Sequence, residues 1–186
     1  MKNDENSQQN ETSIATFGGG CFWCIEAVFQ RLEGVTSVYP GYSGGENPNP
    51  TYREVCSGTT GHVEVVQIKY DPGVITFKEL LEVFFEVHDP TTLNRQGNDV
   101  GTQYRSVIFY HDSSQQKDAE DFIRDLELTG KFDRPIATEV EPLENFYKAE
   151  AYHQDYYNSN LHKPYCQYII KPKIKKLEQL FQDKLD

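Results

Sequence analysis

Residues 62–70 read His-Val-Glu-Val-Val-Gln-Ile-Lys-Tyr, a run rich in the β-branched residues that favour strands. Side chains alternate between the two faces of a strand, which sets Glu64 on the same face as three large residues. These are Val66, Ile68 and Tyr70. The pattern therefore predicts a strand with one carboxylate at the end of an apolar face.

Downstream of this strand, the sequence predicts a helix over residues 77–87. Thr76 and Glu79 have the spacing of a capping box, in which each side chain satisfies a free backbone N–H at the helix start. Asp89-Pro90 ends the helix because proline disfavours helical geometry in the residue before it. Helical spacing joins the apolar positions into one stripe, Phe77, Leu80, Leu81, Phe84 and Val87.

Upstream, a short strand over residues 14–17 leads through three glycines into an expected helix over residues 22–32. Gly34 suits the position that follows a helix end, where a left-handed backbone is common. Cys21 is thereby placed where a glycine turn meets a helix N-terminus. The apolar positions at helical spacing are Phe22, Ile25, Phe29 and Leu32.

The remaining elements follow from turn, cap and periodicity signals. We expect strands at 35–39, 105–110 and 136–140, a helical turn at 51–56, and polar loops at 40–50 and 91–103. A capping box at Ser113 and Gln116 predicts a helix that ends before Gly130. The tyrosine-rich segment 144–160 is interpreted as helical. Near the C-terminus, an amphipathic helix is expected to carry Ile174, Leu177 and Phe181.

Strands and helices alternate along the chain, and no repeat or linker divides it. The sequence therefore predicts an α+β fold, a two-layer α/β sandwich whose mixed sheet has ferredoxin-like character, with flanking helices and long loops. Residues 1–12 hold no large apolar side chain and are interpreted as a disordered leader. Residues 13–186 are expected to form a single catalytic domain.

Charge excludes several kinds of partner. The 186-residue chain carries 18 basic and 29 acidic residues, and its formal charge of −11 disfavours nucleic acid and anionic membranes. The N-terminus lacks the basic start and apolar core of a secretion signal, and no apolar run is long enough to span a membrane. We expect a cytoplasmic protein, where four cysteines indicate chemistry or metal binding before structural disulfides.

The cysteines allow three functional hypotheses. A helix N-terminus stabilises a thiolate, so Cys21 is expected to have a lowered pKa, and Cys24 lies about one turn away, within disulfide reach. The pair suits a redox enzyme that acts on a small apolar group beside Phe22 and Trp23, or a thioredoxin-like dithiol–disulfide exchanger. Zinc bound by all four cysteines is the third hypothesis, although two of them stand alone in the sequence. Simple packing of small side chains is the non-functional alternative.

Glu64 is the candidate acid. Burial on an apolar face raises the pKa of a carboxyl group, and a carboxylic acid that stays protonated near neutral pH can donate a proton. The alternative is a strand-end glutamate that reaches solvent or pairs with Arg53 or Arg105. Tyr52 and Tyr104, in polar surroundings at the ends of elements, could direct their hydroxyls into a cleft.

Three segments carry a resemblance to a known family. They are Gly20-Cys21-Phe22-Trp23, then Asn49 to Cys56 with Gly61-His62-Val63-Glu64, and Arg95 to Ser106, which reads RQGNDVGTQYRS. The chain resembles the A-type peptide methionine sulfoxide reductases over about residues 13–170. The resemblance implies attack by Cys21 on the sulfur of methionine S-sulfoxide, which releases methionine and leaves a sulfenic acid on the enzyme.

The same resemblance implies roles for the other residues. Glu64 is the acid toward the sulfoxide oxygen, and Tyr52 and Tyr104 donate hydrogen bonds to that oxygen. Four residues contact the substrate: Phe22 and Trp23 hold its methyl group, Asp99 helps to orient it, and a looser match adds His153.

Regeneration is where members of the family differ, since many have glycine at the position of Cys24 and resolve the sulfenic acid with a cysteine near the C-terminus. This chain has both Cys24 and Cys166. We expect Cys24 to resolve first because its tether is short, a disulfide with Cys166 to follow, and thioredoxin to reduce the exposed disulfide. Cys56 is interpreted as structural. No metal or other cofactor is expected, and the protein is expected to be a monomer.

Overall fold

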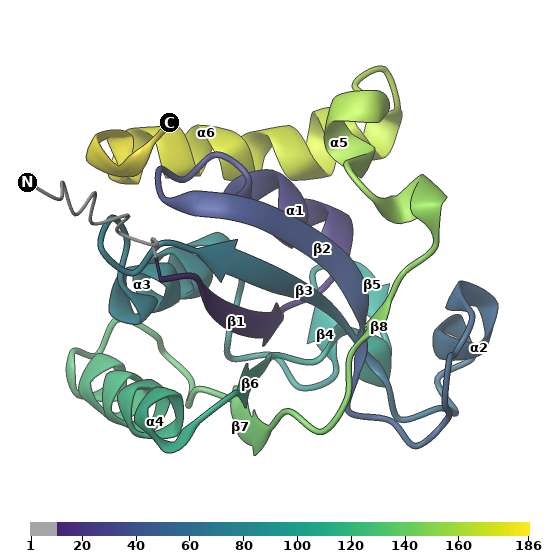
Figure 1. Cartoon of the computed structure of the whole chain (residues 1–186), viewed down its shortest axis with the longest axis horizontal. Coiled ribbons are helices and arrows are strands. Elements are labelled where there is room, and N and C mark those ends of the chain that lie inside the picture. Colours follow the sequence, from purple (N-terminus) through teal and green to yellow (C-terminus); the bar gives the residue numbers. More distant parts are fainter. Residues whose placement is uncertain (1–10) are drawn as a thin grey trace, which may run out of the picture.

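The computed structural model describes residues 11–186, and one six-stranded mixed sheet organises them (Figure 1). The strand order is β7-β6-β1-β3-β2-β8, and neighbours are antiparallel except β6 and β7, which are parallel. A separate hairpin pairs β4 with β5. The strands are β1 (Ser13–Gly18), β2 (Val35–Ser43), β3 (Val63–Tyr70), β4 (Arg95–Gln96), β5 (Asp99–Val100), β6 (Val107–Tyr110), β7 (Glu139–Pro142) and β8 (Tyr147–Lys148).

Helices α1 and α3 pack on one face of the sheet, and α6 runs alongside α1 at the C-terminal end of the chain (Figure 1). No helix of residues 11–186 is both long and apolar enough to cross a membrane. The helices are α1 (Phe22–Phe29), α2 (Tyr52–Cys56), α3 (Phe77–Val87), α4 (Ser113–Leu128), α5 (Tyr156–Ser159) and α6 (Lys171–Leu180), with shorter turns η1 (Thr102–Tyr104), η2 (Ala151–His153) and η4 (Gln182–Lys184) and a π-helical turn η3 (Cys166–Ile170).

The expected fold class is confirmed. The chain order β1-α1-β2-β3-α3-β6 is the βαββαβ unit of ferredoxin-like folds, and its four strands lie in the spatial order β6-β1-β3-β2. Strands β7 and β8 extend this unit at its two edges. Of the leader expected over residues 1–12, residues 1–10 lie outside the part of the chain that the structure describes.

Strand β3 has the alternation that the sequence predicts. Val66 and Ile68 face the main core, where they pack with α1 and α3. Val63 and Val65 face the other side, in a smaller cluster with two residues of β6. Both faces of β3 are therefore covered, and Glu64 is only 2% exposed.

The helix starts follow their caps. Thr76 and Glu79 form the predicted capping box of α3. At α4 the expected box at Ser113 is wrong, because the Asp112 side chain accepts from the Gln115 N–H at 2.8 Å and becomes the cap itself. Helix α1 ends at Phe29 rather than at residue 32, so Gly34 lies in the turn before β2 and not at the helix end.

Two later expectations are wrong in detail. The strand expected at 136–140 begins at Glu139, because the amides of Ile136 and Ala137 bond to Glu127 and Pro90 instead of to β6. The segment 144–160 is no continuous helix. It adds the short strand β8 to β2, passes through η2, and forms helix only in α5.

Candidate active site

Cys21 occupies the N-cap of α1, directly after the glycine turn that leaves β1. Gly20 has a φ of +92°, a conformation that favours glycine, and a Cβ there would lie 2.6 Å from a side-chain carbon of Gln96. The Gln96 side-chain amide accepts a hydrogen bond from the Asp89 N–H and donates one to the Asp89 carbonyl. The glycine turn therefore lets the β4-β5 hairpin approach Cys21 closely.

Glu64 meets the same helix start from the sheet. Its Oε2 accepts a hydrogen bond from the Phe22 N–H at 3.0 Å, which satisfies a backbone donor of the first turn of α1. Among the described residues it forms no ion pair, and Arg105 pairs with Glu139 instead, at 3.3 Å. The geometry thus brings Glu64 to the helix start that carries Cys21.

Burial dominates the protonation of both groups. It raises the pKa of Glu64 to about 8, although the Phe22 N–H opposes the shift, so this carboxyl group retains its proton at neutral pH. Burial also raises the pKa of Cys21 well above its usual value, with smaller contributions from Cys24 and Glu64. The expectation that the helix N-terminus lowers the pKa of Cys21 is therefore wrong, because desolvation outweighs the helix dipole.

An aromatic cage surrounds the first turn of α1. Phe22 is 1% exposed, and its ring lies 6.4 Å from those of Trp23 and Tyr52. The Trp23 indole stacks on Tyr156 at 3.7 Å and donates its N–H to His153 Nδ1 at 3.0 Å. The side chains of Phe22, Trp23, Tyr52 and His153 thus form one apolar enclosure with polar edges.

Two tyrosine hydroxyls complete this side. The pKa values of Tyr52 and Tyr104 are raised, first by burial and then by the nearby Glu64 carboxyl group. Both phenols therefore keep their protons and can donate hydrogen bonds. Tyr52 and Tyr104 thus both lie within the electrostatic influence of Glu64.

Cys24 lines a cavity of about 180 Å³ together with Cys21 and Asp99. The Tyr165 hydroxyl donates to Asp99 Oδ2 at 3.0 Å, so its oxygen is left to accept from the Cys24 thiol at 3.6 Å. The pKa of Cys24 is lowered, chiefly by a hydrogen bond from Cys21 and further by the positive charge of Lys173. Asp99 thus contacts the second thiol through Tyr165.

Comparison with known proteins identifies the family to which this arrangement belongs. The family described as peptide methionine sulfoxide reductase matches residues 13–185. The chain belongs to this family. It is therefore an enzyme, an oxidoreductase, and the resemblance seen in the sequence motifs is confirmed.

Named relatives and solved structures agree. The chain is 58% identical over 172 residues to peptide methionine sulfoxide reductase MsrA of Saccharolobus solfataricus, covering 92% of this chain and 96% of that one. The reduced form of Mxr1 from Saccharomyces cerevisiae has a TM-score of 0.76 at 39% identity, over 84% of this chain and 90% of that chain. Mxr1 in complex with Trx2 has a TM-score of 0.54 at 28% identity, over 81% and 89%.

The other two cysteines of this methionine sulfoxide reductase have different surroundings. Cys166 is fully buried at the start of η3, and burial raises its pKa. Cys56 ends α2 and is exposed. All four thiols are free. Across residues 11–186, no three histidine, cysteine or acidic side chains gather as a metal site would require.

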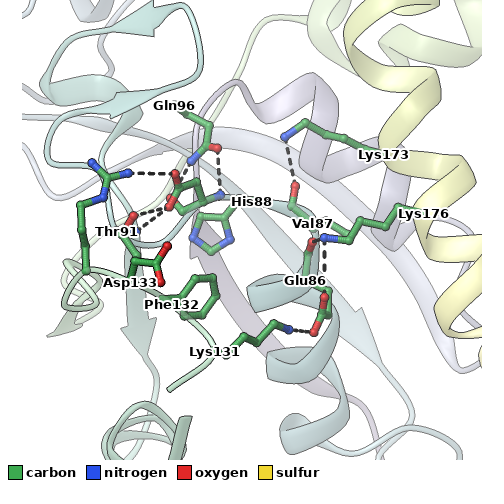
Figure 2. Close-up of a pocket in the computed structure, with 12 residues that line it drawn as sticks. Glu86, Val87, His88, Thr91, Gln96, Lys131, Phe132, Asp133, Lys173 and Lys176 are labelled. Atoms are coloured by element: carbon green, nitrogen blue, oxygen red, sulfur yellow. Dashed lines mark hydrogen bonds and ion pairs between the residues drawn. The ribbon is translucent and has the colours of Figure 1, made fainter. Parts of the chain in front are cut away.

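A larger hollow of about 470 Å³ lies beside the cysteine cavity of the reductase, at the end of α3 (Figure 2). Gln96 and Lys173 line both. Lys131 and Lys176 both pair with Glu86. None of the residues expected to act in catalysis lines this hollow.

Sequence reasoning missed the residues that hold the cage together. Glu26, 1% exposed on α1, accepts the backbone N–H groups of Asp155 and Tyr156 at 2.9 and 3.1 Å. Glu150 accepts from the Tyr42 hydroxyl and from the Tyr52 N–H. A lone glutamate within the apolar run of α1 is a signal that could have revealed Glu26. Glu150 offers none, because its partners are distant in sequence.

Proposed function

We propose that this enzyme reduces the S epimer of methionine sulfoxide, free or within proteins, and so repairs oxidised proteins. One observation carries the proposal: a buried, protonated Glu64 and the Cys21 thiol meet at the start of α1, beside an aromatic cage. A methyl sulfoxide needs these three features, an acid for its oxygen, a nucleophile for its sulfur and an apolar enclosure for its methyl group. The names of the relatives support the same substrate.

In the proposed first step, the Cys21 thiolate attacks the substrate sulfur while Glu64 protonates the sulfoxide oxygen. The new bond joins Cys21 Sγ to the substrate sulfur, and the protonated oxygen leaves as hydroxide. Hydroxide then attacks Cys21 Sγ and breaks this S–S bond, so that methionine leaves with the electron pair and Cys21 becomes a sulfenic acid. Tyr52 and Tyr104 donate hydrogen bonds to the departing oxygen. Stabilisation of developing charge by fixed donors is a large contribution in such reactions.

Substrate binding is assigned to the residues around this point. Phe22 and Trp23 enclose the methyl group, and Asp99 orients the substrate from the β4-β5 hairpin. His153 is fully buried, and its Nε2 has no partner among the described residues, although Trp23 bonds to its Nδ1. A donor left free in this way suits a substrate contact, so we include His153.

Regeneration is proposed to proceed through Cys24. Its thiolate attacks the sulfenic sulfur of Cys21, and the oxygen leaves as water once it has gained a proton, which gives a Cys21–Cys24 disulfide. Cys166 can then exchange with that disulfide, and thioredoxin restores the thiols. The complex of the similar protein Mxr1 with Trx2 supports such a reductant. We further propose that residues 13–186 act as a monomeric catalytic unit in the cytoplasm.

The proposed activity is tested with racemic methionine sulfoxide and dithiothreitol as reductant. We expect one epimer to be consumed and the other to persist, as chiral chromatography of the remaining substrate would show. A general disulfide exchanger would instead reduce insulin and leave both epimers unchanged. That outcome would refute the proposed function.

Replacing Cys24 with serine is expected to separate chemistry from regeneration. The Cys24→Ser variant should release about one methionine per enzyme in the absence of reductant, because Cys21 still attacks the sulfoxide. Thioredoxin-supported turnover should fall at least about tenfold, since no short tether remains to form the first disulfide. Stopped-flow and steady-state measurements of methionine release give the two values. Full turnover with thioredoxin would assign the resolving role to Cys166 instead.

A further inference from the structure

The C-terminal part of this acidic chain contains a basic segment. Residues 156–177 include no aspartate or glutamate but hold five lysines, whereas the whole chain has a charge of −11. Among the described residues, only one of the five forms an ion pair, Lys176 with Glu86. The segment is therefore a local positive surface on a negative protein. Its lysines are Lys163, Lys171, Lys173, Lys175 and Lys176.

This segment borders the cysteine cavity. Tyr165, Ile169 and Lys173 recur at intervals of four residues through η3 and α6, and all three line the cavity that holds Cys21 and Cys24. Helical residues four apart lie on one face, so these side chains form a ridge. The Lys173 ammonium is tied to the Val87 carbonyl at 3.0 Å, which keeps it at the cavity edge (Figure 2).

Beyond the ridge lies a shallow groove of about 590 Å³, lined by residues that include Tyr168, Lys171 and Lys175. Tyr168 is 78% exposed and Ile169 is 39% exposed. Tyrosine is enriched at protein–protein interfaces, and charges around such a residue steer the encounter with an oppositely charged partner. We call Tyr168, Ile169, Lys171 and Lys175 the basic face.

We propose that the basic face docks the protein that returns electrons to this enzyme, a small dithiol protein with an acidic, partly apolar surface around its reactive thiol. The proposal rests on the proposed function and adds the place and the chemistry of the partner. Ile169 joins this face to the cavity of Cys21 and Cys24. On the cage side of Cys21, Phe22 and His153 are buried and offer no exposed surface to a partner protein.

The electron transfer at this face is a thiol–disulfide exchange. The partner thiolate attacks Sγ of Cys21 and forms a mixed disulfide, and Cys24 leaves as a thiolate. Departure of Cys24 is favoured because the positive charge of Lys173 stabilises its thiolate. The second partner thiol then attacks the mixed disulfide and releases Cys21, so that the partner is oxidised and both enzyme thiols are restored.

The test compares two reductants on the same enzyme. A Lys171→Glu/Lys175→Glu double variant and a Tyr168→Ser variant are assayed with dithiothreitol and with a thioredoxin of net negative charge. We expect the KM for thioredoxin to rise on the order of tenfold in each, because charge and an exposed tyrosine favour encounter and anchoring. Turnover with dithiothreitol should stay within about twofold, since a small dithiol needs no docking surface.

Lys78→Glu is the matched control, because Lys78 is exposed on α3 and lines a groove with α4 residues, away from the cysteines. It should leave both activities unchanged. In the unsubstituted enzyme, raising the ionic strength from about 0.01 M to about 0.15 M should raise the KM for thioredoxin, and the double variant should lose this dependence.

Two results would overturn the docking proposal. One is an unchanged KM for thioredoxin in both variants, and the other is an unsubstituted enzyme that turns over with dithiothreitol but not with thioredoxin. Loss of turnover with dithiothreitol in the unsubstituted enzyme would instead refute the proposed function. The two failures are therefore distinguishable.

Discussion

Replacing Cys21 with serine is expected to abolish methionine sulfoxide reduction with every reductant, by a factor on the order of 10⁴ or more. A serine hydroxyl is a far weaker nucleophile than a thiolate toward sulfoxide sulfur, and no other thiol is placed to meet both Glu64 and the cage. Cys24 lies on the side of Tyr165, and Cys166 is fully buried in η3. Methionine release with dithiothreitol measures the loss.

The fold should tolerate this substitution. Cys21 is the N-cap of α1 and makes no side-chain cap bond, whereas serine is a favoured N-cap residue, so the free energy of unfolding should not fall. Cys56→Ser is the matched control, since Cys56 is exposed and is expected to leave turnover intact. Equal activity in the Cys21→Ser and unsubstituted enzymes would remove Cys21 from the mechanism.

The parts of the fold that sequence predicted depend on local signals. The strand at 62–70 and the helix at 77–87 carry their own periodicity, and Thr76 caps the helix with groups only three residues away. Cys21 and Glu64 were predicted for the same reason, because a glycine turn before a helix and a carboxyl group on an apolar strand face are visible in short windows of sequence. Burial of that strand on both faces depends instead on α1 and α3 on one side and on Leu143 and Phe146 on the other.

The segment 144–160 could not be predicted because its partners are distant. Ala149 bonds to Pro40, and the left-handed turn at Asp155 is held where Glu26 accepts two backbone N–H groups. Tyrosines in this segment suit a helix by spacing, but tertiary contacts outweigh local preference. The aromatic stack of Tyr156 on Trp23 was hidden in the sequence for that reason.

The protonation of Cys21 shows a similar limit. A helix N-terminus is a local feature that lowers a thiol pKa, and it is readable from sequence. Burial depends on the whole fold, and here Cys21 is only 9% exposed beside Cys24 and Glu64. The larger effect is thus the one that sequence does not report, and thiolate formation has to be coupled to substrate binding or to proton loss from the Cys21–Glu64 pair.

Replacing Glu64 with glutamine is expected to lower kcat by a factor on the order of 10² to 10⁴, the usual contribution of a general acid. The glutamine carbonyl oxygen can still accept from the Phe22 N–H, so the start of α1 keeps its contact while the transferable proton is lost. Turnover with dithiothreitol measures the loss. The rate of methionine release in a single turnover separates the chemical step from regeneration. Retention of activity within about twofold of the unsubstituted enzyme would exclude Glu64 as the acid.

The dependence on pH gives the sharper test of the same substitution. In the reactive state the Cys21–Glu64 pair holds one proton, which is on the carboxyl group. The unsubstituted enzyme should therefore show a bell-shaped pH profile of kcat/KM. Activity should rise as the pair loses its first proton, near the Glu64 pKa of about 8. Loss of the second proton removes the acid and gives the alkaline decline. In Glu64→Gln that decline should vanish, and the remaining rise should shift to higher pH, because the pKa of Cys21 alone, which burial raises well above its usual value, then governs it. An unchanged bell in the variant would mean that another group supplies the proton.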